Sequence, residues 1–438
     1  MSASAAGVRN VRAIAALALE RIVAGHSLRA EFAAFSTKLS DSRDRALLSA
    51  LLHAGARWWL RHSAAADRLL QRPLPARETR VRALLVLGLI QIDVLGLPEY
   101  AAVDASVEAA RELDKPKFAA LINAVLRRWL RERDALRTDL DADPVTRTAH
   151  PRWLLDAFAA DWPGDGDAIV AANNAEAPLW LRVNRRRSDP AALASRLAAA
   201  GIESETSAQL PDALRVARSL DVTGLPGFRE GEFSVQDGAA QRAADLLDLR
   251  DGQRVLDACA APGGKCAHAL ERADVRMTAL DNDARRLPRL AENLARLGLR
   301  ADLLAGDATQ PERWWDRERF DRILIDAPCS ATGIIRRQPD VKLHRRASDI
   351  AALVRAQRRM LDALWPLLAP GGRLVYATCS VLDAENADQI ERFRARHADV
   401  RPAAPVVGWR ATRAGGAQNL PGESGLDGFF YAVLEKNP

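Results

Sequence analysis

Residues 254–265 read Arg-Val-Leu-Asp-Ala-Cys-Ala-Ala-Pro-Gly-Gly-Lys, and this stretch decides the fold. Arg254–Asp257 predicts a short buried strand, Ala258–Lys265 a turn of small residues, and Cys266–Arg272 the start of a helix. A strand, a turn and a helix in this order bring a ligand to the backbone N–H groups at a helix N-terminus. The stretch lacks the glycine spacing of the Gly-x-Gly-x-x-Gly dinucleotide motif and the hydroxyl of a phosphate-binding Gly-Lys-Ser/Thr loop. A purely structural glycine turn is the alternative at this point.

Short apolar runs that end in polar residues recur downstream of this turn. They cover residues 277–281, 301–307, 320–329 and 372–379. Helical patterns at Ala284–Leu297 and Ala347–Leu368 lie between them, which predicts an α/β fold with a doubly wound parallel sheet. Because ligands bind at the carboxyl ends of parallel strands, the residues at these ends are candidates for a functional site. These residues are Asp281, Asp307, Asp326, Cys329 and Cys379.

Length and composition limit the class of protein. A chain of 438 residues predicts two or three domains, and 48% apolar residues are typical of a globular protein. No apolar run reaches the roughly 18 residues that a membrane helix needs, and Ala83–Ile92 comes nearest. Charged residues interrupt the apolar N-terminus, so it does not resemble a signal peptide. With four cysteines and no Cys-x-x-Cys pair, we expect a cytoplasmic protein with reduced thiols and no membrane partner.

The basic charge is concentrated in the N-terminal third. Residues 1–150 contain 23 Lys+Arg and 17 Asp+Glu, so this third alone carries the net charge of +6 of the whole chain. Such an excess suggests an acidic partner, most simply nucleic acid, although a solvated basic surface explains the charge equally well. Only 6 of the 63 basic residues are lysines, so Lys265 and Lys342 are candidates for sites that need a compact ammonium group.

Residues 8–137 are predicted to be all-helical, because their apolar residues recur at helical spacing. The expected helices are Val11–Val23, Asp44–Arg61, Val81–Leu97, Ala101–Leu113 and Phe118–Arg131. Asp41 and its two serine neighbours are N-cap candidates for the second of these helices. For Trp58, Trp59 and Trp129 we favour packing in the core over stacking on nucleic acid bases.

Two of these helices resemble those of the NusB family of helical RNA-binding domains. One contains Leu-Pro-Glu-Tyr-Ala-Ala-Val at residues 97–103, and the other contains Phe-Ala-Ala-Leu-Ile-Asn-Ala-Val-Leu-Arg at residues 118–127. The family has a similar Pro-x-x-x-x-Val helix and a similar Phe-x-x-x-x-Asn-x-Val-Leu-Arg helix. The resemblance covers residues 5–137 and implies RNA binding rather than catalysis.

Residues 138–230 form a predicted α+β middle region. His150 and the residues after it begin a helix, and Leu179–Arg187 predicts a strand that runs into a basic turn. Ala191–Ala200 predicts another helix, because a glycine stop follows it. The three consecutive arginines of the basic turn either contact phosphates, which we slightly favour, or belong to a solvated turn.

Residues 231–438 resemble the S-adenosylmethionine-dependent cytosine-5 RNA methyltransferases of the RsmB/NOP family. The resemblance rests on residues 257–265, on Asp-Ala-Pro-Cys-Ser at 326–330, on Arg-Arg-Gln-Pro-Asp-Val-Lys at 336–342 and on Ala-Thr-Cys-Ser at 377–380. Paired Pro-Cys and Thr-Cys strand ends in one domain are specific to that family; Leu343, where an aromatic residue is expected, is a minor departure. The resemblance implies a Rossmann-like methyltransferase sheet. The helical N-terminal domain extends it over nearly the whole chain and narrows the implied substrate to bacterial 16S ribosomal RNA.

Methylation of cytosine C5 requires particular side chains, because C5 cannot attack a methyl sulfonium unaided. A thiolate that adds to C6 makes C5 enamine-like, and a base must remove the C5 proton after the methyl group has been taken up. The resemblance implies that Cys379 is the nucleophile and that Cys329 assists release of the product. It also implies that Asp326 bonds the N3/N4 edge of the base. Lys265 would orient Asp326 or favour the thiolate form of Cys379.

The resemblance also implies S-adenosylmethionine as the cofactor. The glycine turn would face its methionine moiety with Ala258, Cys259, Ala260, Ala261, Pro262, Gly263 and Gly264. The two glycines would let the backbone approach closely, because they have no Cβ. Asp281 would accept hydrogen bonds from the ribose hydroxyls, Asp307 would meet the adenine amino group, and Asp326 would border the cofactor. For Asp307, a helix N-cap is the alternative.

The other cysteines and the histidines suggest no further chemistry. Cys259 and Cys266 are expected to be small packing residues rather than metal ligands. No cysteine pair has the short spacing of zinc ligands and the 7 histidines are scattered, so we expect no metal. We expect a disulfide between Cys329 and Cys379 only as an artefact of oxidation, and we expect the protein to be a monomer.

Three alternative functions remain. A cytosine-5 methyltransferase of tRNA or 23S rRNA uses the same chemistry, and only the helical N-terminal domain argues against it. A non-catalytic RNA-binding assembly factor predicts loss of Cys379 or of the glycine turn, yet both are intact. A methyltransferase of small molecules or proteins has no use for two cysteines at strand ends or for a basic N-terminal domain.

Overall fold

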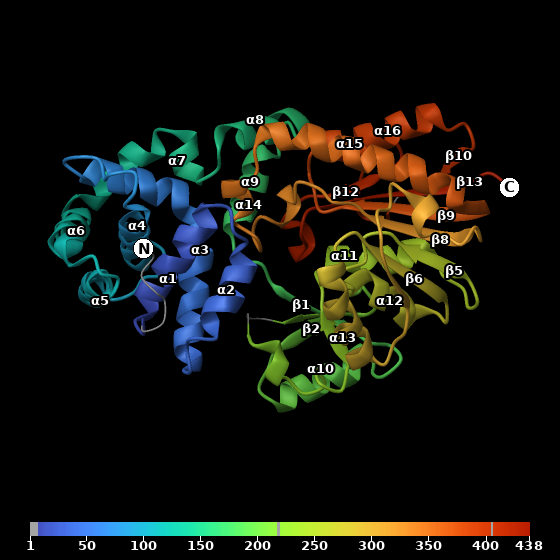
Figure 1. The fold of residues 1–438 in the computed structure, drawn as a ribbon, viewed down its shortest axis with the longest axis horizontal. Helices are drawn as coiled ribbons and strands as arrows, with labels where there is room; N and C mark the ends of the chain where they lie inside the picture. Colours follow the sequence, from blue (N-terminus) through green and yellow to red (C-terminus); the bar gives the residue numbers. More distant parts are fainter. Residues whose placement is uncertain (1–7, 217–219, 404–405) are drawn as a thin grey trace. The chain divides into compact units, whose positions relative to one another are not determined.

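The structure is a computed structural model (Figure 1). It describes residues 8–216, 220–403 and 406–438. The residues outside these ranges, which are 1–7, 217–219 and 404–405, include small parts of all three expected domains. In the described part of the chain, no helix is long and apolar enough to cross a membrane.

The chain folds into two compact units. The first comprises Met1–Ala175 and Ile335–Arg346, and the second comprises Glu176–Ile334 and Ala347–Pro438. The domain boundaries expected after residues 137 and 230 fall inside these units, so they stay predictions. Residues 335–346 of the first unit thus lie between two segments of the second unit in the sequence.

The first unit is helical, as its apolar periodicity predicts. Its helices are α1 (Val11–Val23), α2 (Leu28–Ser36), α3 (Ser42–Leu69), α4 (Thr79–Asp93), α5 (Glu99–Glu112), α6 (Ala119–Asp141), α7 (Pro144–Thr148), α8 (Arg152–Asp161), α9 (Gly166–Asn174) and α14 (Val341–His344). Helix α4 is buried over almost its whole length, from Val81 to Ile92, and α1 and α3 pack against it. Trp129 on α6 is fully buried in the same core, as the packing interpretation requires, whereas Trp58 and Trp59 on α3 are partly buried.

Local polar contacts set the ends of these helices. Asp41 caps α3, because its carboxylate accepts a hydrogen bond from a first-turn N–H at 2.8 Å. Helix α1 has the predicted bounds, whereas α3 and α6 continue past the expected ends at Arg61 and Arg131. An ion pair between Arg68 and Asp139 joins the two extensions. The spacing of apolar residues cannot predict such a contact.

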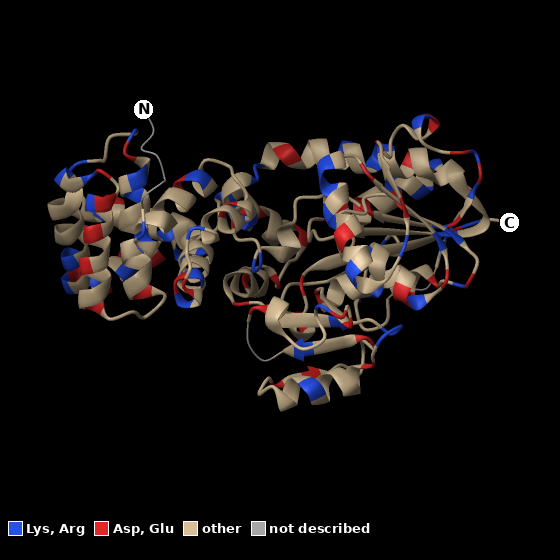
Figure 2. Ribbon diagram, turned by 60° about the horizontal axis from the view of Figure 1, so that its bottom comes forward, with Lys and Arg blue, Asp and Glu red and all other residues tan. Residues whose placement is uncertain are grey.

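Basic and acidic residues alternate over the helices of the first unit (Figure 2). Ion pairs between helices use several of the arginines. Arg61 lies 2.6 Å from Asp141, and Arg133 lies 2.9 Å from the carboxylate of Glu99. Part of the basic excess expected to attract an acidic partner therefore also holds the helices together.

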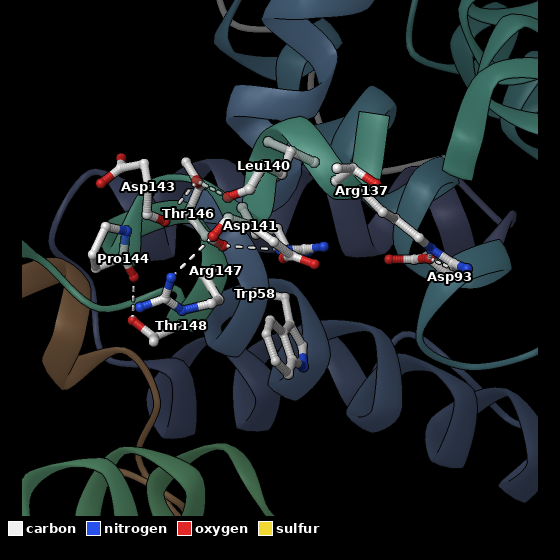
Figure 3. A network of polar contacts seen from close by, with 12 residues as sticks. Trp58, Asp93, Arg137, Leu140, Asp141, Asp143, Pro144, Thr146, Arg147 and Thr148 are labelled. Atoms are coloured by element: carbon white, nitrogen blue, oxygen red, sulfur yellow. Dashed lines mark hydrogen bonds and ion pairs between the residues drawn. The ribbon is translucent and has the colours of Figure 1, made fainter. Parts of the chain in front are cut away.

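A pocket of about 480 Å³ lies on the first unit, beside a network of polar contacts (Figure 3). It is lined by Trp58, Arg61, His62, Asp93, Val94, Arg137, Asp141 and Arg147. The Asp93 carboxylate is 2.9 Å from His62 Nε2 and accepts a 2.5 Å hydrogen bond from Arg137. Burial alone would raise the pKa of Asp93, but these two contacts outweigh burial and lower it to about 2. Because the network joins α3, α4 and α6, we assign it a structural role.

Residues 335–346 belong to the first unit, although their motif was assigned to the catalytic region on sequence. Lys342 is buried there, and its ammonium donates to the carbonyl of Arg57 and to Asn174 Oδ1, both at 2.8 Å. Burial, with the nearby Arg57 charge, lowers the pKa of Lys342 well below its ordinary value. Asp340 accepts a hydrogen bond from the Leu28 N–H at 3.0 Å. The contacts of Lys342 therefore give it a structural role.

The second unit begins with a small antiparallel sheet in the order β2-β3-β1-β4. Its elements are β1 (Leu179–Val183), α10 (Pro190–Ala199), β2 (Ser204–Thr206), β3 (Ala213–Val216) and β4 (Phe233–Val235). The three arginines after β1 all contact protein groups: Arg185 lies 3.6 Å from Asp212, and Arg186 donates to a carbonyl at 2.8 Å. Arg187 donates to the carbonyl of Glu230, so the basic turn is held to the protein rather than simply solvated.

The larger sheet runs in the order β11-β12-β13-β9-β8-β5-β6-β7, with β10 pairing β13. Its strands are β5 (Arg254–Asp257), β6 (Arg276–Asp281), β7 (Asp302–Ala305), β8 (Phe320–Asp326), β9 (Leu368–Thr378), β10 (Val400–Pro402), β11 (Arg410–Ala411), β12 (Ala417–Asn419) and β13 (Phe429–Lys436). Its helices are α11 (Gly238–Leu247), α12 (Gly264–Arg272), α13 (Leu287–Leu297), α15 (Ala347–Leu364) and α16 (Ala387–Arg396). Helices α15 and α16 cover one face and α11, α12 and α13 the other, so the sheet is doubly wound (Figure 1).

The larger sheet is mixed rather than wholly parallel. Strands β7, β6, β5, β8 and β9 are parallel, whereas β13 pairs antiparallel with β9. Strand β13 was not expected from the sequence, because its run of apolar residues follows no helix that would mark a parallel crossover. It brings Phe429, at its first position, next to the end of β9 that precedes Cys379.

Candidate active site

The glycine turn between β5 and α12 is folded by backbone contacts to the neighbouring strands. Ala258 N–H donates to the carbonyl of Leu324 on β8, and Ala260 N–H donates to that of Leu280 on β6, both at 2.9 Å. Gly263 caps α12 with a φ of +101°, a conformation that favours glycine. A Cβ on Gly263 would lie 2.3 Å from a methyl group of Leu290. The positive φ and the close packing against Leu290 therefore both favour glycine at this position.

Replacing Gly263 with alanine is expected to destabilise the second unit by about 3 kcal/mol, because the positive φ and the clash with Leu290 add. Gly252 offers a matched control, since its φ is +82° but nothing lies within 4 Å of its added Cβ. Gly252→Ala should cost only about 1 kcal/mol. Chemical denaturation of both variants checks this, and equal losses would contradict the packing argument.

Arg182 on β1 holds the turn from the other side, and sequence reasoning missed it. Its guanidinium donates to the carbonyl of Gly264 at 2.5 Å and to Gln236 Oε1 at 2.5 Å. The same side chain forms a fully buried ion pair with Glu271 on α12, at 2.7 Å. The hydrophobic pattern of β1 gives no signal for this role; a charged residue inside an apolar strand is the only hint.

Two of the expected strand-end carboxylates differ in their surroundings. Asp281 is buried, accepts the Ala261 N–H at 3.0 Å and pairs with Arg286 at 3.2 Å, so it lies directly beside the glycine turn. Asp307 is exposed and accepts hydrogen bonds from the N–H and hydroxyl of Thr309, both at 2.8 Å. Asp307 therefore closes a local turn, as the capping alternative describes, and its role toward adenine stays a prediction.

Asp257, at the end of β5, is a titratable group that sequence reasoning did not single out. Its side chain is almost fully buried, and its Oδ1 has no hydrogen-bond partner among the described residues. Burial raises the pKa of Asp257 to about 7, and the negative charge of Asp326 adds to the increase. A carboxyl group therefore titrates near neutral pH at this edge of the sheet.

Asp257→Asn is expected to change the pH dependence of stability. Between about pH 4 and pH 7 the native Asp257 keeps a proton that the unfolded chain has lost, so wild-type stability falls as the pH rises through this window. The contribution reaches at most about 4 kcal/mol. The melting temperature of the variant minus that of the wild type should therefore increase between pH 5 and pH 8. A constant difference would mean that Asp257 titrates normally.

Lys265 and Asp326 form an ion pair at the start of α12 and the end of β8. The ammonium lies 2.6 Å from Asp326 Oδ2 and 4.9 Å from the ring centre of Phe429. Burial opposes the charge of Lys265, but attraction and hydrogen bonding to Asp326 outweigh it and raise its pKa. Cys379 is also close enough to contribute to that increase. The structure thus brings together three residues that the sequence placed in one site.

Two cysteines meet where β8 and β9 end. The Sγ atoms of Cys329 and Cys379 are 3.4 Å apart, a hydrogen-bonding rather than a disulfide distance. Cys379 is partly exposed and Cys329 is buried behind it. The hydrogen bond with Cys379, together with burial, raises the pKa of Cys329 well above its ordinary value. Cys329 therefore holds its proton, and Cys379 is the thiol that a substrate can reach.

The two remaining cysteines behave as packing residues. Cys266 is fully buried on α12 in the core beneath the sheet, and burial raises its pKa well above the ordinary value. Burial, with the nearby carboxylates, also raises the pKa of Cys259, so neither thiol is poised as a nucleophile. Among the described residues, no group of three or more His, Cys, Asp and Glu side chains is arranged to hold a metal ion.

Three family profiles match successive parts of the chain. The profile of the NusB family matches residues 9–131, and a ferredoxin-like domain of RsmF/B-like methyltransferases matches residues 150–223. The profile described as 16S rRNA methyltransferase RsmB/F matches residues 244–435. The expected order of a helical NusB-like domain, a small α+β segment and a methyltransferase sheet is confirmed.

Curated relatives match the chain over almost its whole length. Ribosomal RNA small subunit methyltransferase B of Pseudomonas putida is 48% identical over 98% of this chain and 98% of its own. The protein of the same name from Xylella fastidiosa is 49% identical over 97% of this chain and 98% of its own. The relative from Vibrio cholerae is 45% identical over 98% of both chains.

Solved structures share the fold. One chain that is 23% identical superposes with a TM-score of 0.82 over 98% of this chain and 99% of its own. A methyltransferase homolog protein from Pyrococcus horikoshii is 27% identical, with a TM-score of 0.60 over 67% of this chain and 97% of its own. The likeness at the higher TM-score supports the fold.

Proposed function

Because the chain belongs to the family of ribosomal RNA small subunit methyltransferase B, a family of 16S rRNA methyltransferases, we propose that it methylates C5 of a cytosine in 16S rRNA. The methyl donor in this proposal is S-adenosylmethionine, and the reaction passes through a covalent bond between Cys379 and C6 of the base. The resemblance to the RsmB/NOP family drawn from the sequence is confirmed by the same relatives.

One observation carries the chemical part of this proposal. A partly exposed thiol, Cys379, lies 3.4 Å from a buried thiol, Cys329, beside the ion pair of Lys265 and Asp326. Methylation at C5 needs a nucleophile, an acid near N3 and a base for the C5 proton, held in one site. These four side chains supply the nucleophile, a proton donor and the groups that bond the N3/N4 edge, on the ends of two adjacent strands and the helix after the glycine turn.

The proposed reaction can be followed bond by bond. The Cys379 thiolate forms a bond to C6, and the displaced electron pair moves toward N3, where Asp326 bonds the base edge. C5 then forms a bond to the methyl group as the electron pair returns from N3, and the C5 proton passes to water. As the C5 proton leaves, the bond between C6 and Cys379 breaks and aromaticity returns. The protonated Cys329 donates its S–H to the departing sulfur of Cys379, which favours release.

The residues at the edge of the sheet fit the proposed cofactor. Asp257, Asp281 and Asp326 act on one another electrostatically there, and Asp257 Oδ1 lacks a partner among the described residues. S-Adenosylmethionine carries a sulfonium and an ammonium group, and it would supply a methyl group that an activated carbon can take. Ala258–Gly264 would hold the methionine end and Asp281 the ribose hydroxyls. Asp307 would be reached by the adenine amino group if its local turn opens.

The substrate is tested by methyl transfer from labelled S-adenosylmethionine to unmodified 16S rRNA, with 23S rRNA and tRNA in parallel, followed by analysis of the nucleosides. We expect 5-methylcytidine in 16S rRNA alone. Transfer to tRNA or 23S rRNA instead would keep the chemistry and overturn the substrate, and another methylated nucleoside would overturn the chemistry. Because the substrate is ribosomal and all four cysteines are free thiols, we also propose the cytoplasm as the place of action.

A further inference from the structure

Glu385 is a fully buried carboxylate in the short turn Asp383–Glu385, between Cys379 and α16. Its two oxygens accept four hydrogen bonds. Oε1 accepts from the backbone N–H of Ser330 at 2.9 Å and from the amide of Gln357 at 3.0 Å. Oε2 accepts from the hydroxyls of Ser330 at 2.5 Å and Ser380 at 2.6 Å.

Three of the four hydrogen bonds to Glu385 come from the two loops that carry the cysteines, and the fourth comes from Gln357 on α15. Ser330 follows Cys329, and Ser380 follows Cys379. The two hydroxyls are 3.1 Å apart, and both also contact the hydroxyl of Thr332, at 3.1 and 3.2 Å. The loops therefore meet at a single buried carboxylate, immediately behind the pair of thiols.

Burying a carboxylate costs several kcal/mol unless hydrogen bonds satisfy it, and here they do. An apolar side chain would fill the same space at lower cost, but it could not hold two serine hydroxyls and a backbone N–H at fixed positions. The arrangement therefore fixes one loop against the other. A shift of about 1 Å between reacting groups lowers rates by about 10²-fold, so such a constraint matters for catalysis.

We propose that Glu385 is the positioning residue that sets the separation of Cys329 and Cys379. It acts through Ser330 and Ser380 and does not touch the substrate. The effect of Glu385 on the rate of methylation rests on the proposed function, in which both thiols take part. The effect of Glu385 on the distance between the two thiols is independent of that function.

Two substitutions separate positioning from charge. Glu385→Ala removes all four acceptor contacts. Glu385→Gln keeps the length of the side chain: its carbonyl can accept from Ser330 N–H and Gln357, and its NH₂ can donate to the two serine oxygens after the hydroxyls turn. If position is what matters, glutamine should restore most of the function. Glu391→Ala, an exposed carboxylate on α16, is the matched control.

The geometry is measured without RNA by oxidation with diamide, which takes up the two electrons and two protons lost when Cys329 and Cys379 form a disulfide. Mass spectrometry counts the bond, because trypsin releases the cysteines in separate peptides, residues 323–336 and 374–392. We expect Glu385→Ala to slow this reaction at least about tenfold, and Glu385→Gln and Glu391→Ala to stay within about twofold of the wild type.

The effect on catalysis is measured by the kinetics of methyl transfer to 16S rRNA. We expect Glu385→Ala to lower kcat by about 10²-fold with an unchanged KM for S-adenosylmethionine, and Glu385→Gln to recover most of kcat. If Glu385→Ala does not fold, Ser380→Ala, which removes one hydroxyl, should show both effects in weaker form. A wild-type rate of disulfide formation in Glu385→Ala overturns the proposal, and the same rate in Ser380→Ala does so if that variant has to be used instead. The proposal is also overturned if Glu385→Gln reacts as slowly as Glu385→Ala. A wild type inactive on every RNA would overturn the proposed function alone.

Discussion

Cys379→Ala is expected to abolish methyl transfer to RNA, with kcat lowered by about 10⁴-fold or more. Without a sulfur to add to C6, C5 stays a poor nucleophile, and Cys329 cannot replace the thiol because it is buried. Filter binding of the methylated RNA, with labelled S-adenosylmethionine at saturation, measures the loss.

Two controls make this result specific. Cys266→Ala removes a thiol that packs in the core, so it should leave kcat within a few-fold of the wild type. The Cys379→Ala protein should still bind S-adenosylmethionine, because Cys379 lies outside the glycine turn. If the variant retained more than about a hundredth of the wild-type rate, Cys379 could not be the nucleophile.

Cys329→Ala is expected to accumulate a covalent complex between enzyme and methylated RNA that survives a denaturing gel. Addition through Cys379 proceeds in this variant, but the sulfur that must leave C6 has lost its proton donor at 3.4 Å. Removing such an acid slows a step by about 10²- to 10⁴-fold, so turnover falls while the adduct builds up. Gel electrophoresis of the variant with labelled 16S rRNA measures the complex.

The double variant Cys329→Ala/Cys379→Ala serves as the control, since it should form no complex at all. A complex formed by Cys379→Ala and not by Cys329→Ala would mean that the two roles are reversed. Rapid turnover by Cys329→Ala without any adduct would mean that product release needs no help from Cys329.

The parallel part of the second unit could be predicted from sequence because its signals are local. Strands β5 to β9 follow local apolar runs, β5 has the expected bounds, and β8 begins at the expected Phe320 and ends at Asp326. Helix α1 also has the expected bounds, because its apolar periodicity and its capping residue indicate the same helix start. The later strands β10 to β13 pair over long distances in the chain, and no local pattern registers the antiparallel partner of β9.

The candidate site could be predicted as a set of strand ends, but not as a geometry. Apolar runs ending in Asp326, Cys329 and Cys379 place these residues at one edge of a sheet, and the structure puts the two sulfurs 3.4 Å apart. Arg182 and Glu385 were missed because their roles lie in hydrogen bonds to distant loops. Burial of a charged residue can be seen only once the chain has folded.

Lys342 shows what composition alone does not decide. Its rarity as a lysine in an arginine-rich chain suggested a functional ammonium, yet the residue is buried in the helical unit and bonded to the Arg57 carbonyl and to Asn174. An ammonium group is small enough to fit between two acceptors where a planar guanidinium is not. Composition therefore identified an unusual position correctly but could not distinguish a structural from a catalytic reason.

The central claim is a bond between Cys379 and C6 of a cytosine, and a substrate that cannot complete the reaction tests it most directly. In 16S rRNA made with 5-fluorocytidine, a fluorine replaces the C5 proton that must leave, so the adduct should persist in the wild-type enzyme. Trypsin and nuclease digestion followed by mass spectrometry locates the nucleotide. We predict a methylated fluorocytidine nucleotide on the peptide of residues 374–392, attached at Cys379. Its attachment to the peptide of residues 323–336, or a wild-type enzyme that transfers methyl groups to normal RNA but forms no adduct with this one, would contradict the account.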